Sequence, residues 1–92
     1  MAKERTLISL RSVGPATIRD LAELGITSVA ELAEREAQEL YDGLCARTGQ
    51  QHDICVLDVF SCAVAQARDP NLPQEQQDWF WWSARRKCAT SR

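Results

Sequence analysis

Residues 54–67 read Ile-Cys-Val-Leu-Asp-Val-Phe-Ser-Cys-Ala-Val-Ala-Gln-Ala, and this stretch decides the fold. Its polar side chains are few, namely Asp58, Ser61 and Gln66, so almost every face of a helix formed here is apolar. A β-strand is too short to account for 14 such residues. We therefore expect a central helix over residues 54–68 that is buried in the middle of an all-α bundle, with Asp53 as its N-cap.

The segments before this helix carry the start and stop signals of shorter helices. Apolar residues within 3–11 indicate one or two helical turns, and Pro15 then opens a helix of about ten residues that ends at Gly25. Ser28, with Glu31 three residues later, has the spacing of a capping box at the start of a helix over 28–36. A further helix is expected over 37–47, closed by Gly49.

After the central helix, Asp-Pro-Asn-Leu-Pro at 69–73 breaks the chain, and Pro73 opens a last helix through 74–78 into the aromatic segment 79–82. Residues 83–92 indicate a flexible basic tail. The predicted architecture is one compact bundle of five or six short helices over residues 1–82.

Composition restricts the class of protein. The 92 residues suit one domain, and 45% hydrophobic with 26% charged residues is typical of a globular protein rather than of a disordered or fibrous chain. No apolar run is long enough to span a membrane, and the N-terminal residues lack the apolar core of a signal peptide. We expect a cytoplasmic protein without a membrane partner, whose four cysteines are reduced.

The net charge of −2 conceals an uneven distribution. Residues 1–19 carry +3 and residues 83–92 carry +4, whereas residues 20–58 carry −7 and residues 59–82 carry −2. A local basic surface is therefore possible on an acidic protein, provided that the fold brings basic residues together.

Residues 10–32 read Leu-Arg-Ser-Val-Gly-Pro-Ala-Thr-Ile-Arg-Asp-Leu-Ala-Glu-Leu-Gly-Ile-Thr-Ser-Val-Ala-Glu-Leu and resemble a helix-hairpin-helix motif over about 4–25. Gly14 permits a tight turn, and the free amides of a helix that begins at Pro15 attract phosphate without reading a base. The resemblance implies a SAM-like fold and DNA binding without sequence preference, and it allows a monovalent cation held by hairpin carbonyls. The candidate DNA contacts are Arg11, Ser12, Val13, Gly14, Ala16, Thr17 and Arg19.

Two positions depart from the DNA-binding form of the motif. Ser12 stands where glycine is common, and Ala16 stands where lysine is common. The alternative is that the hairpin only packs helices or recruits a protein.

The resemblance extends along the chain. Glu-Leu-Tyr-Asp-Gly-Leu-Cys at 39–45, His-Asp-Ile-Cys-Val-Leu-Asp-Val-Phe-Ser-Cys-Ala-Val at 52–64 and Trp-Phe-Trp-Trp at 79–82 resemble the small bacterial pathogenicity-locus or mitomycin-resistance family. That resemblance implies a non-enzymatic DNA-binding domain with a link to DNA repair or DNA-damage resistance. It implies no cofactor beyond the cation at the hairpin.

A zinc site is a competing interpretation of Cys45, His52, Cys55 and Cys62. Zinc ligands usually come in close pairs, and His52 with Cys55 is the one such pair in this set. Cys55 and Cys62 are two helical turns apart, about 10.5 Å, which is too far to share an ion or form a disulfide. We expect buried thiols, and neither a metal site nor a catalytic cysteine with His52 as its base.

The environments of Asp58 and of the aromatic segment 79–82 are the last expectations from the sequence. Asp58 lies inside an apolar helix and is expected either to face solvent or to pair with an arginine or an indole N–H. The four consecutive aromatics at 79–82 complete the core, or they offer Trp79, Trp81 and Trp82 for stacking on unpaired bases or for a protein or homodimer interface. Four consecutive residues cannot all face inward from one helix, so we expect at least one to be exposed.

Overall fold

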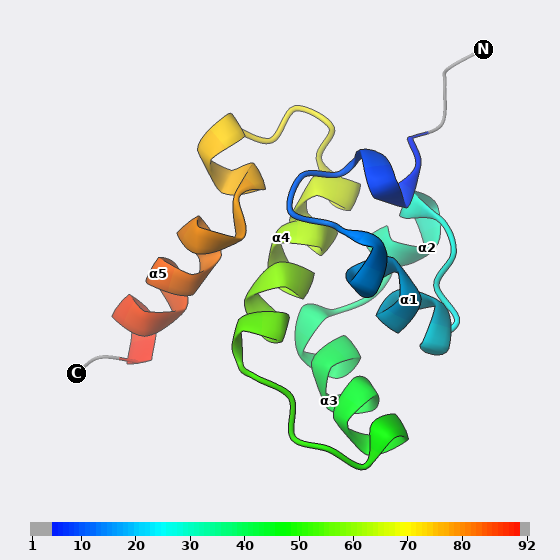
Figure 1. The fold of residues 1–92 in the computed structure, drawn as a ribbon. Helices are drawn as coiled ribbons and strands as arrows, with labels where there is room; N and C mark the ends of the chain where they lie inside the picture. Colours follow the sequence, from blue (N-terminus) through cyan, green and yellow to red (C-terminus); the bar gives the residue numbers. More distant parts are fainter. Residues whose placement is uncertain (1–4, 91–92) are drawn as a thin grey trace.

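The computed structural model describes residues 5–90, with backbone alone at residues 89 and 90, and every regular element in that range is helical (Figure 1). The predicted all-α class is confirmed. The elements in chain order are the 3₁₀ turn η1 (Leu7–Ser9), α1 (Pro15–Glu23), α2 (Val29–Ala33), α3 (Ala37–Thr48), α4 (Cys55–Arg68), the 3₁₀ turn η2 (Gln74–Gln77) and α5 (Trp79–Thr90).

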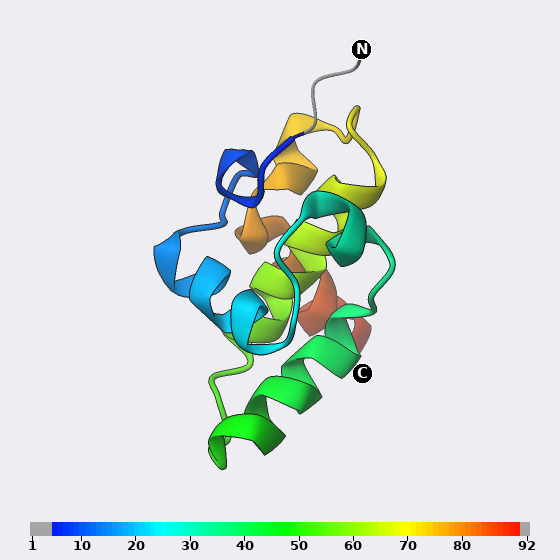
Figure 2. The same ribbon diagram turned by 90° about the vertical axis from the view of Figure 1, so that its right-hand side faces the viewer.

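Helix α4 occupies the centre of the molecule, as its apolar sequence predicts. It contacts α2 and α3 on one side and α5 and η2 on the other, and both views show α5 on the side of α4 away from α1 (Figures 1 and 2). Phe60 of α4 is fully buried. The other large apolar side chains with almost no exposure are Leu21, Ile26, Leu32, Leu40 and Leu44. These leucines and Ile26 join α1, α2 and α3 to α4 in one core.

The predicted helix boundaries rest on capping interactions that the structure contains. Pro15 occupies the first turn of α1, and Gly25 adopts the left-handed conformation after it, with φ of +82°. The Ser28 hydroxyl accepts a hydrogen bond from the Glu31 N–H at the start of α2, and the Glu31 carboxylate accepts one from the Thr27 N–H. The hydrogen bonds that the Glu31 carboxylate accepts, first of all from the Thr27 N–H, hold the pKa of Glu31 below its ordinary value.

Asp53 also acts at a helix start, although α4 begins at Cys55. Its carboxylate accepts a hydrogen bond from the Cys55 N–H at 2.9 Å, which lowers the pKa of Asp53. A second capping box, between Glu36 and Glu39, opens α3.

The expected helical segment over residues 3–11 is a single 3₁₀ turn, Leu7–Ser9, within the described residues. Two long-range contacts explain the difference. The Arg5 guanidinium donates to the carbonyls of Gln66 and Ala67 at the end of α4. The Gln66 side chain accepts a hydrogen bond from the Arg11 N–H and donates one to the Arg11 carbonyl. A helical ladder would need these Arg11 groups for itself.

The prediction of a flexible tail from residue 83 is wrong for residues 83–90, because α5 continues from Trp79 to Thr90. Ser83 is buried, and Arg86 forms an ion pair with Asp58 of α4, so tertiary contacts hold this end of the chain. Residues 91 and 92 of the predicted tail lie outside the described residues. The expected helix from Pro73 is divided, since η2 and α5 are separate elements.

Among the helices of residues 5–90, none combines the length and the hydropathy that a membrane crossing requires.

Candidate functional site

The candidate hairpin lies between η1 and α1, and Ser12 is its most unusual residue. Ser12 has φ of +67°, the left-handed region that glycine occupies most easily, which explains on physical grounds why glycine is common at this position of the motif that the sequence resembles. Its hydroxyl donates to the Gln77 carbonyl at 3.2 Å and accepts from the Trp79 N–H at 3.1 Å. The hydroxyl therefore joins the hairpin to the start of α5 and is directed into the molecule.

Gln66, in the last turn of α4, holds the hairpin against the bundle. Its side-chain oxygen accepts from the Arg11 N–H at 2.9 Å, and its amide nitrogen donates to the Arg11 carbonyl at 2.7 Å. Gln66 is 4% exposed. No role for Gln66 follows from the sequence alone, although an amide side chain in a largely apolar helix is a signal of a buried polar contact. This bidentate contact fixes the hairpin against the bundle.

The start of α1 leaves backbone amides without side-chain partners. Gly14 is the N-cap, and no side chain caps the helix there. The first bond of the helix runs from the Ile18 N–H to the Gly14 carbonyl, so the amides of Ala16 and Thr17 precede it. A Cβ built on Gly14 would meet nothing within 4 Å, so the space beside the turn is open. Such a helix start carries partial positive charge.

The seven predicted DNA contacts differ in exposure. Arg11, Ala16 and Arg19 are exposed, whereas Val13 is buried in the core and offers only its backbone. The remaining three, Ser12, Gly14 and Thr17, are half-buried.

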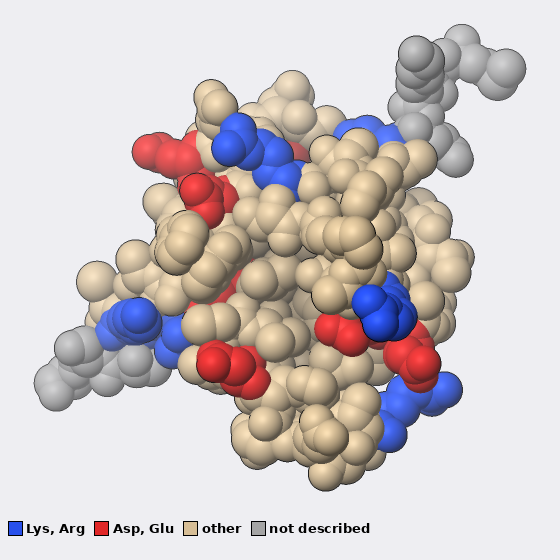
Figure 3. All heavy atoms as spheres, in the orientation of Figure 1, with Lys and Arg blue, Asp and Glu red and all other residues tan. Residues whose placement is uncertain are grey.

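Arg11 and Arg19 do not share one electrostatic environment. Within residues 5–90, neither makes an ion pair. Arg11 lines a cavity of about 430 Å³ together with Glu75 and Asp78, and these carboxylates oppose the approach of a phosphate. On the face shown in Figure 3, the basic side chains lie apart, most of them next to acidic ones, and form no continuous patch. Arg19 does not line this cavity, and of its acidic neighbours on α1, Asp20 and Glu23, the second pairs with Arg47. Arg19 is therefore the candidate phosphate contact that Glu75 and Asp78 do not oppose.

Asp58 pairs with an arginine, one of the two expected arrangements. The Arg86 Nε donates to Asp58 Oδ1 at 2.8 Å, and Nη2 donates to Oδ2 at 3.0 Å. Asp58 is 1% exposed, and its hydrogen bond raises the pKa of Arg86. This bidentate pair joins α5 to α4.

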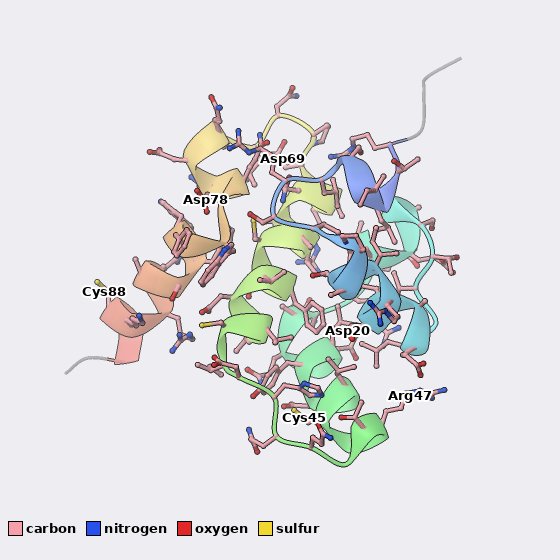
Figure 4. All side chains as sticks on the ribbon, in the orientation of Figure 1. Asp20, Cys45, Arg47, Asp69, Asp78 and Cys88 are labelled. Carbon is pink, nitrogen blue, oxygen red and sulfur yellow. The ribbon has the colours of Figure 1, made fainter. Side chains whose placement is uncertain are left out.

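The predicted zinc alternative is not assembled, because within the described residues no three His, Cys, Asp or Glu side chains lie close enough to hold a metal. The His52 ring lies 2.8 Å from the Thr48 hydroxyl, and Cys45 accepts a weak bond from the His52 backbone N–H. Cys62 is buried, and burial raises its pKa to about 11. Cys45 lies on α3, whereas Cys88 points away from the far side of α5 (Figure 4).

The aromatic segment exposes a residue other than those named for stacking. Phe80 is 63% exposed and stacks on Trp79 with ring centroids 4.0 Å apart, whereas Trp79, Trp81 and Trp82 are half-buried. Trp81 and Trp82 meet edge to face, and the Trp82 indole N–H donates to the Gln76 carbonyl at 2.8 Å. The expectation that at least one aromatic is exposed is confirmed.

Comparison with known proteins adds the following. The family model described as "Pathogenicity locus" matches residues 2–88. Mitomycin resistance protein McrB of Streptomyces lavendulae is 37% identical over 81 residues, which cover 88% of this chain and 73% of that protein. No solved structure matches.

Proposed function

The chain belongs to the pathogenicity locus family, and from that premise we propose that it is a non-enzymatic module that binds duplex DNA weakly through phosphates. The observation that carries the proposal is the uncapped start of α1 beside Gly14, held in place by Gln66. A relative named for mitomycin resistance supports a link to DNA repair or DNA-damage resistance.

The contacts that we propose are made by the backbone and by one exposed cation. The amides of Ala16 and Thr17 would donate to a phosphate oxygen, and Arg19, one turn later on α1, would supply a full positive charge. Arg11 contributes less because Glu75 and Asp78 lie beside it. Since phosphate carries no sequence information, binding of this kind does not select a sequence.

Two hairpin carbonyls accept hydrogen bonds within the chain, that of Leu10 from the Val13 N–H and that of Arg11 from the Gln66 side chain. The proposed phosphate contacts require no monovalent cation at the hairpin. We assign no catalytic role to His52, whose ring contacts Thr48 rather than a thiol.

The test is fluorescence anisotropy of a labelled duplex at low and raised salt. Arg19→Gln should weaken binding about five-fold, the effect of losing one exposed charge contact of about 1 kcal/mol. Arg47→Gln is the matched control, because Arg47 is also exposed but lies on α3, paired with Glu23. No binding at tens of micromolar protein in low salt, or an equal loss in both variants, would contradict the proposal.

A second candidate function is self-association through the aromatic segment, which the exposure of Phe80 favours. Sedimentation at several protein concentrations tests it. A dimer that Phe80→Ser converts to monomer would support this function, and a monomer at every concentration would exclude it.

A further inference from the structure

A second cavity lies on another part of the molecule, between the start of α3, the middle of α4 and α5. Its volume is about 310 Å³, which is within the range of pockets for small ligands. Leu57 of α4 and Trp82 of α5 supply apolar walls, and Ser61 and Arg85 supply polar groups. None of these residues belongs to the hairpin.

The charges around this cavity cancel in pairs, with one exception. Asp58 is bound to Arg86, and Glu36 accepts from Arg68 at 3.1 Å. Arg85 is exposed and makes no ion pair within residues 5–90. The charge that the cavity offers to a ligand is therefore a single guanidinium.

Aromatic rings position this guanidinium. The Arg85 carbon CZ lies 5.4 Å from the Trp81 ring centroid and 5.9 Å from that of Trp82, and Trp82 is itself fixed by its bond to the Gln76 carbonyl. Arginine held in this way presents both a flat face, on which a base can stack, and N–H groups for an anion.

We propose that this cavity binds one unpaired nucleotide, with the base against the wall formed by Trp82 and Leu57 and the phosphate at Arg85. Free phosphate would leave the apolar walls uncovered, and an apolar ligand would leave Arg85 without a partner. A nucleotide covers the apolar walls with its base and places its phosphate at Arg85, and it can be free or part of a single strand. The proposal goes beyond duplex binding by the hairpin and does not depend on it, because α1 and α5 lie on opposite sides of α4 (Figure 1).

The experiment is a titration of the full chain followed by tryptophan fluorescence, with deoxyadenosine monophosphate, a deoxyadenosine tetramer and inorganic phosphate as probes. The monophosphate and the tetramer should change the fluorescence saturably, and phosphate alone should not. A midpoint concentration much lower for the tetramer than for the monophosphate would identify single-stranded DNA as the ligand. Similar midpoints, counted per nucleotide, would identify the free nucleotide as the ligand.

Three variants locate the site. Arg85→Gln should raise the midpoint about ten-fold, the effect of losing a charge-assisted hydrogen bond. Arg85→Lys, which keeps the charge without the flat face, should raise it by less. Lys87→Gln removes the same charge from an exposed position of α5 that does not line the cavity, and it should leave the midpoint unchanged.

The proposal is overturned by an unsaturable response to both nucleotides, by unchanged binding in Arg85→Gln, or by an equal loss in Lys87→Gln. The duplex titration separates this result from the hairpin proposal. Arg19→Gln should weaken duplex binding and leave monophosphate binding unchanged. Arg85→Gln should weaken monophosphate binding and leave duplex binding unchanged.

Discussion

Ser12 shows how one residue can carry a conformational cost and a compensating contact. Its left-handed backbone is unfavourable for any residue with a Cβ, but its hydroxyl accepts from the Trp79 N–H and donates to the Gln77 carbonyl. Glycine would remove the strain and lose both bonds. Serine at this position therefore combines an unfavourable backbone conformation with two hydrogen bonds that link the hairpin to the start of α5.

Substitutions at Ser12 separate the two effects. Ser12→Ala keeps the strain and loses the hydroxyl, so the free energy of unfolding in urea should fall by about 2 kcal/mol. Ser12→Gly also loses the hydroxyl but relieves the strain, so it should be more stable than Ser12→Ala by about 1 kcal/mol. An alanine variant as stable as the glycine variant would show that the backbone is not strained at this residue.

The cysteines should differ in reactivity according to their burial. The Cys62 thiol, with a pKa of about 11, is almost wholly protonated at pH 8 and is covered by neighbouring side chains, whereas Cys88 is exposed. A thiol reagent at pH 8 should modify Cys88 at once and Cys62 only at the rate of unfolding, as mass spectrometry of the modified peptides can measure. Rapid modification of Cys62 in the native protein would contradict this assignment.

At the scale of elements, the parts that the sequence predicts well are those fixed by local signals. Pro15, Gly25 and the pair Ser28 and Glu31 determine their helix ends through neighbours only a few residues away, and they do so in the structure. The apolar composition of residues 54–67 likewise predicts the buried position of α4.

The parts that the sequence misses depend on distant partners. The helical state of residues 83–90 accompanies the pair between Arg86 and Asp58, 28 residues apart. The conformation of the hairpin depends on Gln66, 55 residues from Arg11. Periodicity contains no information about which buried polar side chain meets which backbone group. For the same reason, the candidate phosphate contacts could be named from the motif, but the acidic neighbours of Arg11 could not.

The contribution of the ion pair to the packing of α5 is measurable by a double-mutant cycle. Arg86→Met leaves the buried Asp58 carboxylate without its counter-charge and should lower the free energy of unfolding by about 3 kcal/mol, and Asp58→Leu, which removes the carboxylate that Arg86 contacts, should lower it by less. The double variant should lose less stability than Arg86→Met alone, because no buried carboxylate then remains without a counter-charge. Additive losses in urea denaturation would show that the two residues act independently.

At the scale of the whole molecule, the basic side chains of α1 and of α5 are separated, since these helices lie on opposite sides of α4 (Figure 1). The protein carries a net charge of −2, so its general field does not attract DNA. Duplex binding must then depend on a few local contacts, and the logarithm of its affinity should fall with that of salt concentration with a slope of about −1 to −2.

Adding one positive charge at the start of α1 tests this local dependence. Ala16 is exposed in the first turn of α1, and Ala16→Lys should add a phosphate contact, tighten duplex binding about five-fold at low salt and steepen the salt slope by about 0.9. Ala30→Lys changes the net charge equally at an exposed position of α2. If the hairpin is the binding surface, only the first variant gains affinity. An equal gain in both would mean that net charge, and not the geometry around Gly14, controls the attraction to DNA.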